Sequence, residues 1–184
     1  MVAAILTGVI LSEGFALWRV IVGLHRGGKT LADLGFRLEA PLGGYMAAIA
    51  LAAAYCAAAI WANPSIGRFH LSSLKSLAFA AALMAGFFEE IFFHGYIMTA
   101  LKTAGHDAVT QLAASSIAFG AVHIVWGLPS GHFLAPMAWT TFLGLALGVL
   151  YLRSGRGLGP VILAHVLIDA VIEPGLLLSA LRPF

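Results

Sequence analysis

Residues 81–100 read AALMAGFFEEIFFHGYIMTA, and this stretch decides how the rest of the chain is interpreted. It is apolar and long enough for a helix that crosses a membrane, since such a helix needs about 20 residues. Glu89 and Glu90 nevertheless stand side by side in its middle. An acidic residue at the centre of a membrane helix costs roughly 2.5–3.5 kcal/mol on insertion scales. The pair therefore indicates a functional site inside the membrane, and the simpler alternative is a buried structural ion pair.

The composition of the whole chain favours a membrane protein. Of its 184 residues, 61% are hydrophobic and only 10% are charged, whereas soluble domains are about 45–50% apolar. The net charge of +2 is too small to indicate a nucleic-acid partner. The single cysteine, Cys56, excludes a disulfide within the chain and is expected to be a small core residue.

Six hydrophobic segments have the length of a membrane span. They predict an all-α, polytopic membrane helix bundle in a single domain, residues 1–184, with the active site buried between the helices. The motif-bearing core of this domain runs approximately over residues 74–181. The predicted spans are residues 2–24, 42–62, 74–101, 108–127, 132–152 and 161–181. Within the fifth span, Gly144 and Gly148 have GxxxG spacing, which predicts close helix packing.

Basic residues are distributed unevenly between the two ends of the predicted bundle. The first, third and fifth loops carry six Lys or Arg residues, and the opposite side carries three. Since cytoplasmic loops are enriched in Lys and Arg, both termini are predicted to lie outside the cytoplasm. The six are Arg26, Lys29, Arg37, Lys102, Arg153 and Arg156, and the three are Arg68, Lys75 and Arg182.

Three of the predicted spans carry polar side chains that could meet in one buried cavity. Each has two residues that are four apart and therefore share a helix face: Glu90 and His94, Phe119 and His123, and His165 and Asp169. At a rise of about 1.5 Å per residue, Glu89, His123 and His165 all fall within the membrane. Neighbouring residues on a helix point about 100° apart. One glutamate is therefore expected to be held by a partner, which leaves Glu89 available for chemistry.

A carboxylate and an imidazole on one water molecule form a general base, and a second imidazole with a partner can stabilise an oxyanion. Together they can hydrolyse an amide. Alternatively, Glu89, His123 and His165 form the one-carboxylate, two-histidine ligand set of catalytic zinc, although no HExxH or GxSxG motif occurs. A third alternative is a non-catalytic membrane protein that binds a partner or handles protons or ions, since buried Glu and His also serve as proton relays.

Three motifs resemble those of the CPBP family, the CAAX proteases and bacteriocin-processing enzymes also called Abi proteins. FFEEIFFHGY resembles the family's EExxxR motif, FGAVH its FxxxH motif and HVLID its HxxxN/D motif. The order and spacing match over residues 87–170, and each motif lies in a hydrophobic segment. The segment LADLGFRLEAP before the second span is also similar to the family.

The resemblance implies a glutamic-type intramembrane endopeptidase that cleaves a membrane-embedded or lipidated protein. Its partners would be that substrate and the lipid bilayer, and its location would be the inner membrane of a bacterium. In the family, the residues matching Glu89 and His123 activate the attacking water, and those matching His165 and Asp169 line the oxyanion site. No cofactor is expected, and zinc is the alternative, held by Glu89, His123 and His165.

The chain departs from the family in its first motif, because His94 stands where the family usually has arginine. Arginine stays cationic and holds a carboxylate bidentately, whereas histidine titrates near neutrality. We expect Glu90 and His94 to be hydrogen-bonded and to support the helix that presents Glu89, as Phe119 does, with no direct part in bond cleavage. Because of this difference at His94, the substrates of the prenyl-processing family members predict the substrate of this chain less strongly.

Overall fold

The computed structural model describes residues 2–36, 40–64, 73–126, 131 and 134–180. These residues form helices and, within the ranges described, no strand, which confirms the predicted all-α class. Six long helices are present, and the third is built from three consecutive segments: α3, η2 and α4. The elements are α1 (Val2–Arg26), η1 (Leu31–Leu34), α2 (Leu42–Ala62), α3 (Ser73–Glu89), η2 (Glu90–Ile97), α4 (Met98–Thr103), α5 (Ala108–Val122), η3 (His123–Trp126), α6 (Leu134–Arg153) and α7 (Leu158–Ala180).

Two of the described helices, α2 and α6, are long and apolar enough to cross a membrane, judged by length and composition. The helix α5 and the part of α7 up to Ile172 are apolar but shorter. The six expected helices are therefore present, whereas a bundle in which all six cross the membrane stays a prediction.

The largest difference from the predicted helix ends concerns the fourth helix, which was expected to run over residues 108–127. The α-helix ends at Val122 and tightens into the 3-10 turn η3, as the last turn of a helix often does. His123 therefore lies at the end of a helix, not within one. Several residues used in the predictions lie outside the described ranges: Arg37, Arg68, Gly127, His132, Leu181 and Arg182.

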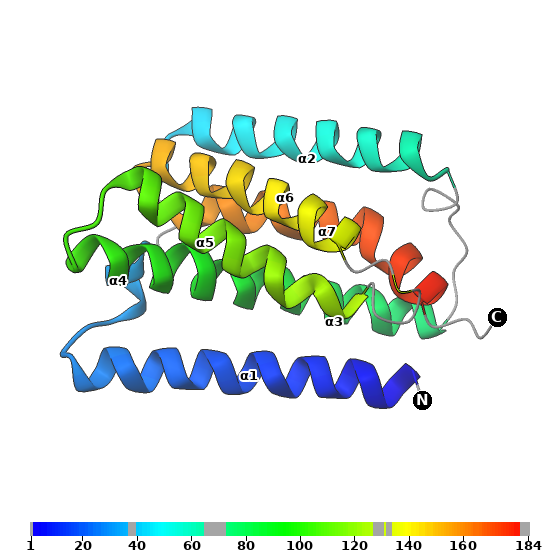
Figure 1. Cartoon of the computed structure of the whole chain (residues 1–184), viewed down its shortest axis with the longest axis horizontal. Coiled ribbons are helices and arrows are strands. Elements are labelled where there is room, and N and C mark those ends of the chain that lie inside the picture. The colour runs from blue at the N-terminus through cyan, green and yellow to red at the C-terminus, as the bar shows by residue number, and fades with distance from the viewer. Residues whose placement is uncertain (1, 37–39, 65–72, 127–130, 132–133, 181–184) are drawn as a thin grey trace.

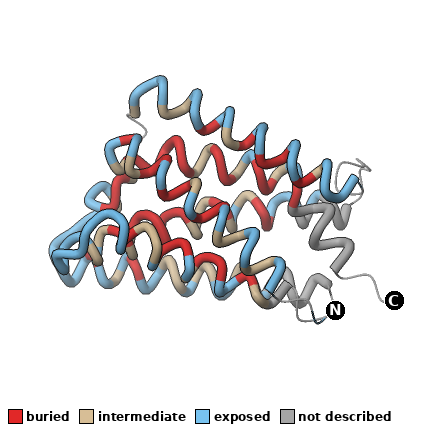
Figure 2. Tube along the Cα trace, turned by 45° about the horizontal axis from the view of Figure 1, so that its top comes forward, coloured by how far each residue is buried: buried red, intermediate tan, exposed pale blue. Residues whose placement is uncertain are grey.

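The helices run side by side, with α1 along one edge of the bundle and α2 along the opposite edge (Figure 1). Between them, α5 packs against α6, while α7 packs against both α2 and α3. The edge helix α1 packs mainly against α3 and η2. Buried residues concentrate on the central helices, and the outer face of α2 is exposed (Figure 2). A site formed by α3, η2, α5 and α7 therefore lies in the interior of the bundle.

Glycines allow the central helices to approach closely, as the GxxxG spacing predicted. A Cβ atom on Gly144 would lie 3.1 Å from the Phe119 ring, and one on Gly148 would lie 2.4 Å from Leu112 of α5. From the other side, a Cβ atom on Gly120 would lie 2.7 Å from a backbone carbonyl oxygen of α6. Side chains at these positions would push α5 and α6 apart.

The connections from α1 to α2, from α4 to α5 and from α6 to α7 lie at one end of the bundle (Figure 1). There the turn η1 is held against the rest of the fold. The Tyr151 hydroxyl donates to the carbonyl oxygen of Leu34 at 3.1 Å, and the Leu158 amide donates to that of Gly35 at 2.8 Å. Gly35 has φ +86°, a left-handed conformation that favours glycine. The loop after α1 therefore has a defined place beside η2 and α4.

Candidate active site

The two adjacent glutamates lie where the third helix changes its geometry. The α-helical segment α3 ends at Glu89, and the π-helical segment η2 begins at Glu90. Turns of π-helix are rare and frequently occur at functional sites. Ser115 of α5 donates its hydroxyl hydrogen to the carbonyl oxygen of Phe93 at 2.7 Å. This backbone oxygen of the π-helical segment therefore has a hydrogen-bond partner in α5. The sequence did not predict the π-helix, and no motif in it signals one.

Glu90 and His94 form a fully buried pair, and both side chains have an exposed fraction of 0%. Nδ1 of His94 lies 2.6 Å from Oε2 of Glu90, which confirms the expected hydrogen bond. Nε2 of His94 lies 3.0 Å from the carbonyl oxygen of Gly144 on α6. A carbonyl oxygen can only accept, so Nε2 carries a hydrogen. The ring thereby connects the third helix to α6.

A second histidine binds the other oxygen of Glu90. Nδ1 of His165, on α7, lies 2.7 Å from Oε1 of Glu90. The carboxylate of Glu90 thus contacts one histidine in its own helix and another in α7. The sequence predicted the first contact, since four residues separate the partners, but it contained no signal for the second. Nδ1 of His165 is thus occupied by Glu90, and the oxyanion role expected of His165 stays a prediction for its other ring nitrogen.

Glu89 faces two imidazole rings from different helices. Its Oε2 lies 3.9 Å from Nε2 of His123 and 3.9 Å from Nε2 of His165. Both distances exceed that of a direct hydrogen bond, and a water molecule that bonds to both groups can connect them across such a separation. The Glu89 side chain is 17% exposed, compared with 0% for Glu90. The structure therefore brings Glu89, His123 and His165 together, and Glu89 is the more accessible glutamate.

The orientation of each imidazole follows from its Nδ1 atom. Nδ1 of His123 lies 2.8 Å from the carbonyl oxygen of Phe119, one turn earlier in the chain. That oxygen can only accept, so Nδ1 of His123 carries the hydrogen, and Nε2 faces Glu89. In His165 the carboxylate of Glu90 has the same effect. Both rings are thus held by one nitrogen and present the other to the same oxygen of Glu89.

Asp169 completes the cluster on α7. Its Oδ1 lies 3.4 Å from Nε2 of His165, one helical turn away. The helices α3 and α7 come close at this point because residue 86 is a glycine. A Cβ atom on Gly86 would lie 2.8 Å from Oδ2 of Asp169 and 3.4 Å from the His165 ring. The sequence showed that Gly86 precedes Glu89 by about one turn, but nothing in it indicated that the glycine faces Asp169.

Phe119 forms an apolar wall of the cluster. Its side chain is fully buried, and its ring centroid lies 4.7 Å from that of His123 and 5.5 Å from that of His165. It also packs edge-on against Phe93 of η2 at 5.3 Å. The backbone of Phe119 orients His123, and its ring restricts both histidines. The supporting part expected for Phe119 stays a prediction.

The zinc alternative requires three donor atoms that can reach one ion. With bonds of about 2.0–2.2 Å in tetrahedral geometry, neighbouring donors lie about 3.3 Å apart. The two separations from Glu89 are 3.9 Å. Within the described part of the chain, no group of three His, Cys, Asp or Glu side chains is arranged to hold a metal ion. The separations from Glu89 are therefore wider than those of a closed tetrahedral zinc site, and zinc remains the alternative.

A comparison with known protein families finds a match over more than half of the chain. The family described as Rce1-like, type II CAAX prenyl endopeptidase Rce1-like, matches residues 71–171 of the 184-residue chain. The matched region begins before α3 and ends within α7, so it contains every residue of the cluster around the two glutamates. No curated protein and no solved structure matches the chain.

Proposed function

Since the chain belongs to the Rce1-like family of type II CAAX prenyl endopeptidases, whose members are membrane-embedded proteases, we propose that it is an intramembrane endopeptidase. One observation carries the proposal beyond the family. Nε2 atoms of His123 and His165 approach the same oxygen of Glu89 from two helices, each at 3.9 Å. At that spacing one water molecule, lying to the side of the line that joins the two atoms, can bond to both the carboxylate and an imidazole inside an otherwise apolar bundle.

In the proposed reaction, this water attacks the carbonyl carbon of the scissile peptide bond. Nε2 of His123 accepts a hydrogen bond from the water and orients it, while the carboxylate of Glu89 accepts its proton. The new C–O bond gives a tetrahedral intermediate, and Glu89 then delivers the proton to the amide nitrogen as the C–N bond breaks. A positioned general base contributes about 10²–10⁴-fold to such a step.

His165 and Asp169 are proposed to stabilise the oxyanion of that intermediate. The carboxylates of Glu90 and Asp169 lie 2.7 and 3.4 Å from the two ring nitrogens of His165, and a cationic ring between them can donate from Nε2. Donors that are already oriented towards the developing charge are typically worth about 10²–10³-fold in turnover. Glu90 is proposed to have no direct chemical part, because both its oxygens are bound to histidines.

The family description suggests a substrate whose C-terminus ends in a prenylated CAAX sequence. We propose this class of substrate. Because His94 replaces the arginine that is usual in the motif, the proposal also includes other membrane-embedded or lipidated proteins. All six helices are proposed to cross the membrane, which is the inner membrane if the source is a bacterium. The bundle then places Glu89 within the hydrocarbon region, where a lipidated substrate can reach it laterally.

The test is cleavage of a synthetic peptide that ends in a prenylated CAAX sequence by the purified protein in liposomes. Reaction in ¹⁸O-labelled water should place one ¹⁸O atom in the new carboxylate, as seen by mass spectrometry, and Glu89→Gln should lower the rate of product formation by about 10²–10⁴-fold. The same assay is run with a set of acylated and unmodified membrane peptides. If the parent protein binds the prenylated peptide but cleaves neither it nor any peptide of that set, the proposed activity is contradicted.

A further inference from the structure

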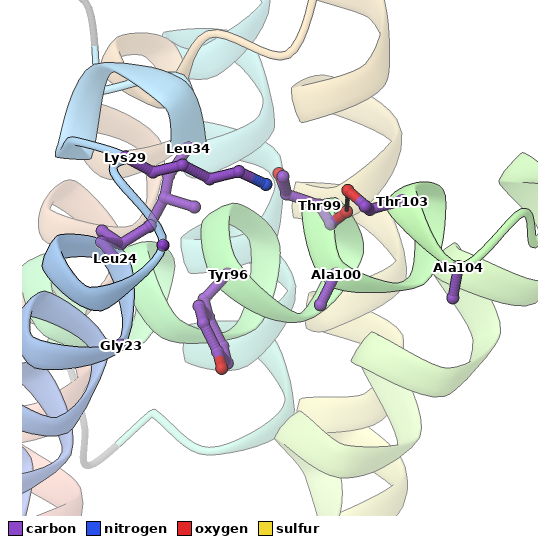
Figure 3. Close-up of a pocket in the computed structure, with 10 residues that line it drawn as sticks. Gly23, Leu24, Lys29, Leu34, Tyr96, Thr99, Ala100, Thr103 and Ala104 are labelled. Atoms are coloured by element: carbon purple, nitrogen blue, oxygen red, sulfur yellow. Dashed lines mark hydrogen bonds between the residues drawn. The ribbon is translucent and has the colours of Figure 1, made fainter.

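A separate cavity lies between the end of α1, the turn η1 and the segment from Tyr96 to Ala104 (Figure 3). Its volume is about 410 Å³, within the range of roughly 300–1,000 Å³ that is usual for small-molecule sites. It shares no residue with the cluster around Glu89. Much of its wall is apolar and comes from Leu24, Leu34, Tyr96, Ala100 and Ala104.

The one charged side chain among the residues lining this cavity is Lys29. Figure 3 shows it extending across the opening towards Thr99 of α4. Lys29 is exposed and forms no ion pair within the described part of the chain. The nearby carboxylate of Asp33 is engaged within its own turn, because it accepts hydrogen bonds from the amide and the hydroxyl of Thr30 at 2.6 and 3.0 Å. The ammonium group of Lys29 interacts with that carboxylate only through space, and because the side chain is exposed an external anion can reach it.

The cavity lies at the basic end of the bundle. Arg26, Lys102 and Arg153 are exposed at the same end, where the loops carry most of the Lys and Arg residues. This bias predicts the cytoplasmic side, and the cytoplasmic leaflet is the one rich in anionic lipids. Basic pockets between membrane helices on that side bind anionic headgroups.

We propose that this cavity binds a phospholipid with an anionic headgroup. The phosphate lies against Lys29 and the Thr99 hydroxyl, and an acyl chain lies along Leu24, Leu34 and Ala100. The ammonium group of Lys29, at the level of the helix ends, matches the anionic headgroup of such a lipid. The apolar cavity below it matches the acyl chain. This proposal rests on the proposed location of the protein in a membrane, as in its family. It does not depend on the catalytic roles proposed for Glu89 or the histidines.

The test is native mass spectrometry of the full-length protein in detergent, titrated with phosphatidylglycerol or phosphatidylcholine. The parent should retain one phosphatidylglycerol and little phosphatidylcholine. Lys29→Gln should weaken retention about fivefold, the effect of one lysine near an anionic surface, and Ala100→Phe should prevent it by filling the cavity. The matched controls are Lys102→Gln, exposed at the same end but outside the cavity, and Ala54→Phe, exposed on α2. Both should bind lipid as the parent does.

Equal retention of the two lipids, or an equal loss of phosphatidylglycerol binding in Lys29→Gln and Lys102→Gln, would show that the lipid binds through general surface charge. Either result would overturn the proposal. Displacement of the bound lipid by a prenylated peptide would assign the cavity to the substrate, which also overturns it. Peptide cleavage is measured on the same preparations. Normal cleavage by a Lys29→Gln protein that has lost its lipid would support the lipid site independently of the catalytic assignment.

Discussion

Nδ1 of His165 lies 2.7 Å from Oε1 of Glu90, although 75 residues separate the two in the chain. This hydrogen bond joins the start of the π-helical segment η2 to α7. It also sets the orientation of the imidazole, so that Nε2 of His165 faces Glu89. The adjacent glutamates thus contact the two sides of one ring. Glu90 holds the ring in place, and Glu89 has the more accessible carboxylate, which suits it for the chemistry.

The first prediction concerns Glu89 and His123, which are proposed to act on one water. Glu89→Gln and His123→Ala should each lower the turnover of a cleavable peptide by about 10²–10⁴-fold, because either change removes half of the water-activating pair. The double variant should be little worse than either single one, since residues that act as a unit are not additive. Melting temperatures serve as the control for folding. Near-normal turnover of Glu89→Gln, or fully multiplicative losses, would refute the pairing.

The second prediction concerns the buried clamp on Glu90. His94→Leu removes one partner of a pair with no exposure, which typically costs about 3–5 kcal/mol of folding free energy. His94→Arg keeps a cation beside Glu90 but must displace α6, because a Cβ atom on Gly148 would already lie 3.3 Å from the His94 ring. Overpacking of this kind costs about 1–3 kcal/mol.

We therefore expect His94→Leu to have the lower melting temperature in detergent, and His94→Arg to keep measurable activity. The matched control is His106→Leu, which changes an exposed histidine and should melt like the parent. If His94→Leu melts like the parent and is nevertheless inactive, His94 belongs to the catalytic residues and not to their support.

The third prediction concerns Gly86, where a Cβ atom would lie 2.8 Å from Oδ2 of Asp169. An alanine in a helix normally stabilises by about 0.5–1 kcal/mol relative to glycine, so Gly86→Ala should change the melting temperature little. It should nevertheless lower kcat by about 10- to 100-fold with a smaller effect on KM, because Asp169 and His165 move relative to Glu89. Gly14→Ala is the control, since nothing lies within 4 Å of its new Cβ atom. An unchanged kcat in Gly86→Ala would show that catalysis does not require the close approach of α3 and α7.

The fourth prediction concerns two neighbouring serines of α5. Ser115→Ala removes the donor to the Phe93 carbonyl oxygen of the π-helical segment, which should cost about 1–3 kcal/mol for a buried acceptor left without this donor. For a chain of this length, each kcal/mol lowers the melting temperature by about 2–4 °C. Ser116→Ala loses only a bond to a carbonyl four residues back in its own helix and should have a smaller effect. Equal melting temperatures for the two variants would argue against Ser115 as an anchor of η2.

The fifth prediction concerns metal. Separations of 3.9 Å from Glu89 to both histidines are wider than those between tetrahedral zinc ligands, so we expect the purified protein to carry well below one equivalent of zinc and to remain active after strong chelation. Elemental analysis and turnover on the same sample provide the measurement. Stoichiometric zinc, with activity lost on stripping and regained on adding zinc back, would establish the metalloprotease instead.

Much of the fold was predictable because it depends on local properties of the chain. Apolar segments of about 20 residues identified the six helices, and the spacing of Gly144 and Gly148 predicted that the helix α6 packs closely against a neighbour, which proved to be α5. The bond between Glu90 and His94 was also predictable, since residues four apart are neighbours on the surface of a helix. The helix ends were less certain, and His123 proved to lie in a 3-10 turn after α5.

What only the tertiary structure decided is the set of contacts between helices. The sequence placed Glu89, His123 and His165 at similar depths, but the bond of His165 to Glu90, the place of Asp169 against Gly86 and the anchor from Ser115 to Phe93 were not readable from it. Helical periodicity fixes which residues share a face within one helix. It does not fix which face meets a neighbouring helix, or at what register, because that depends on how all six helices pack together at once.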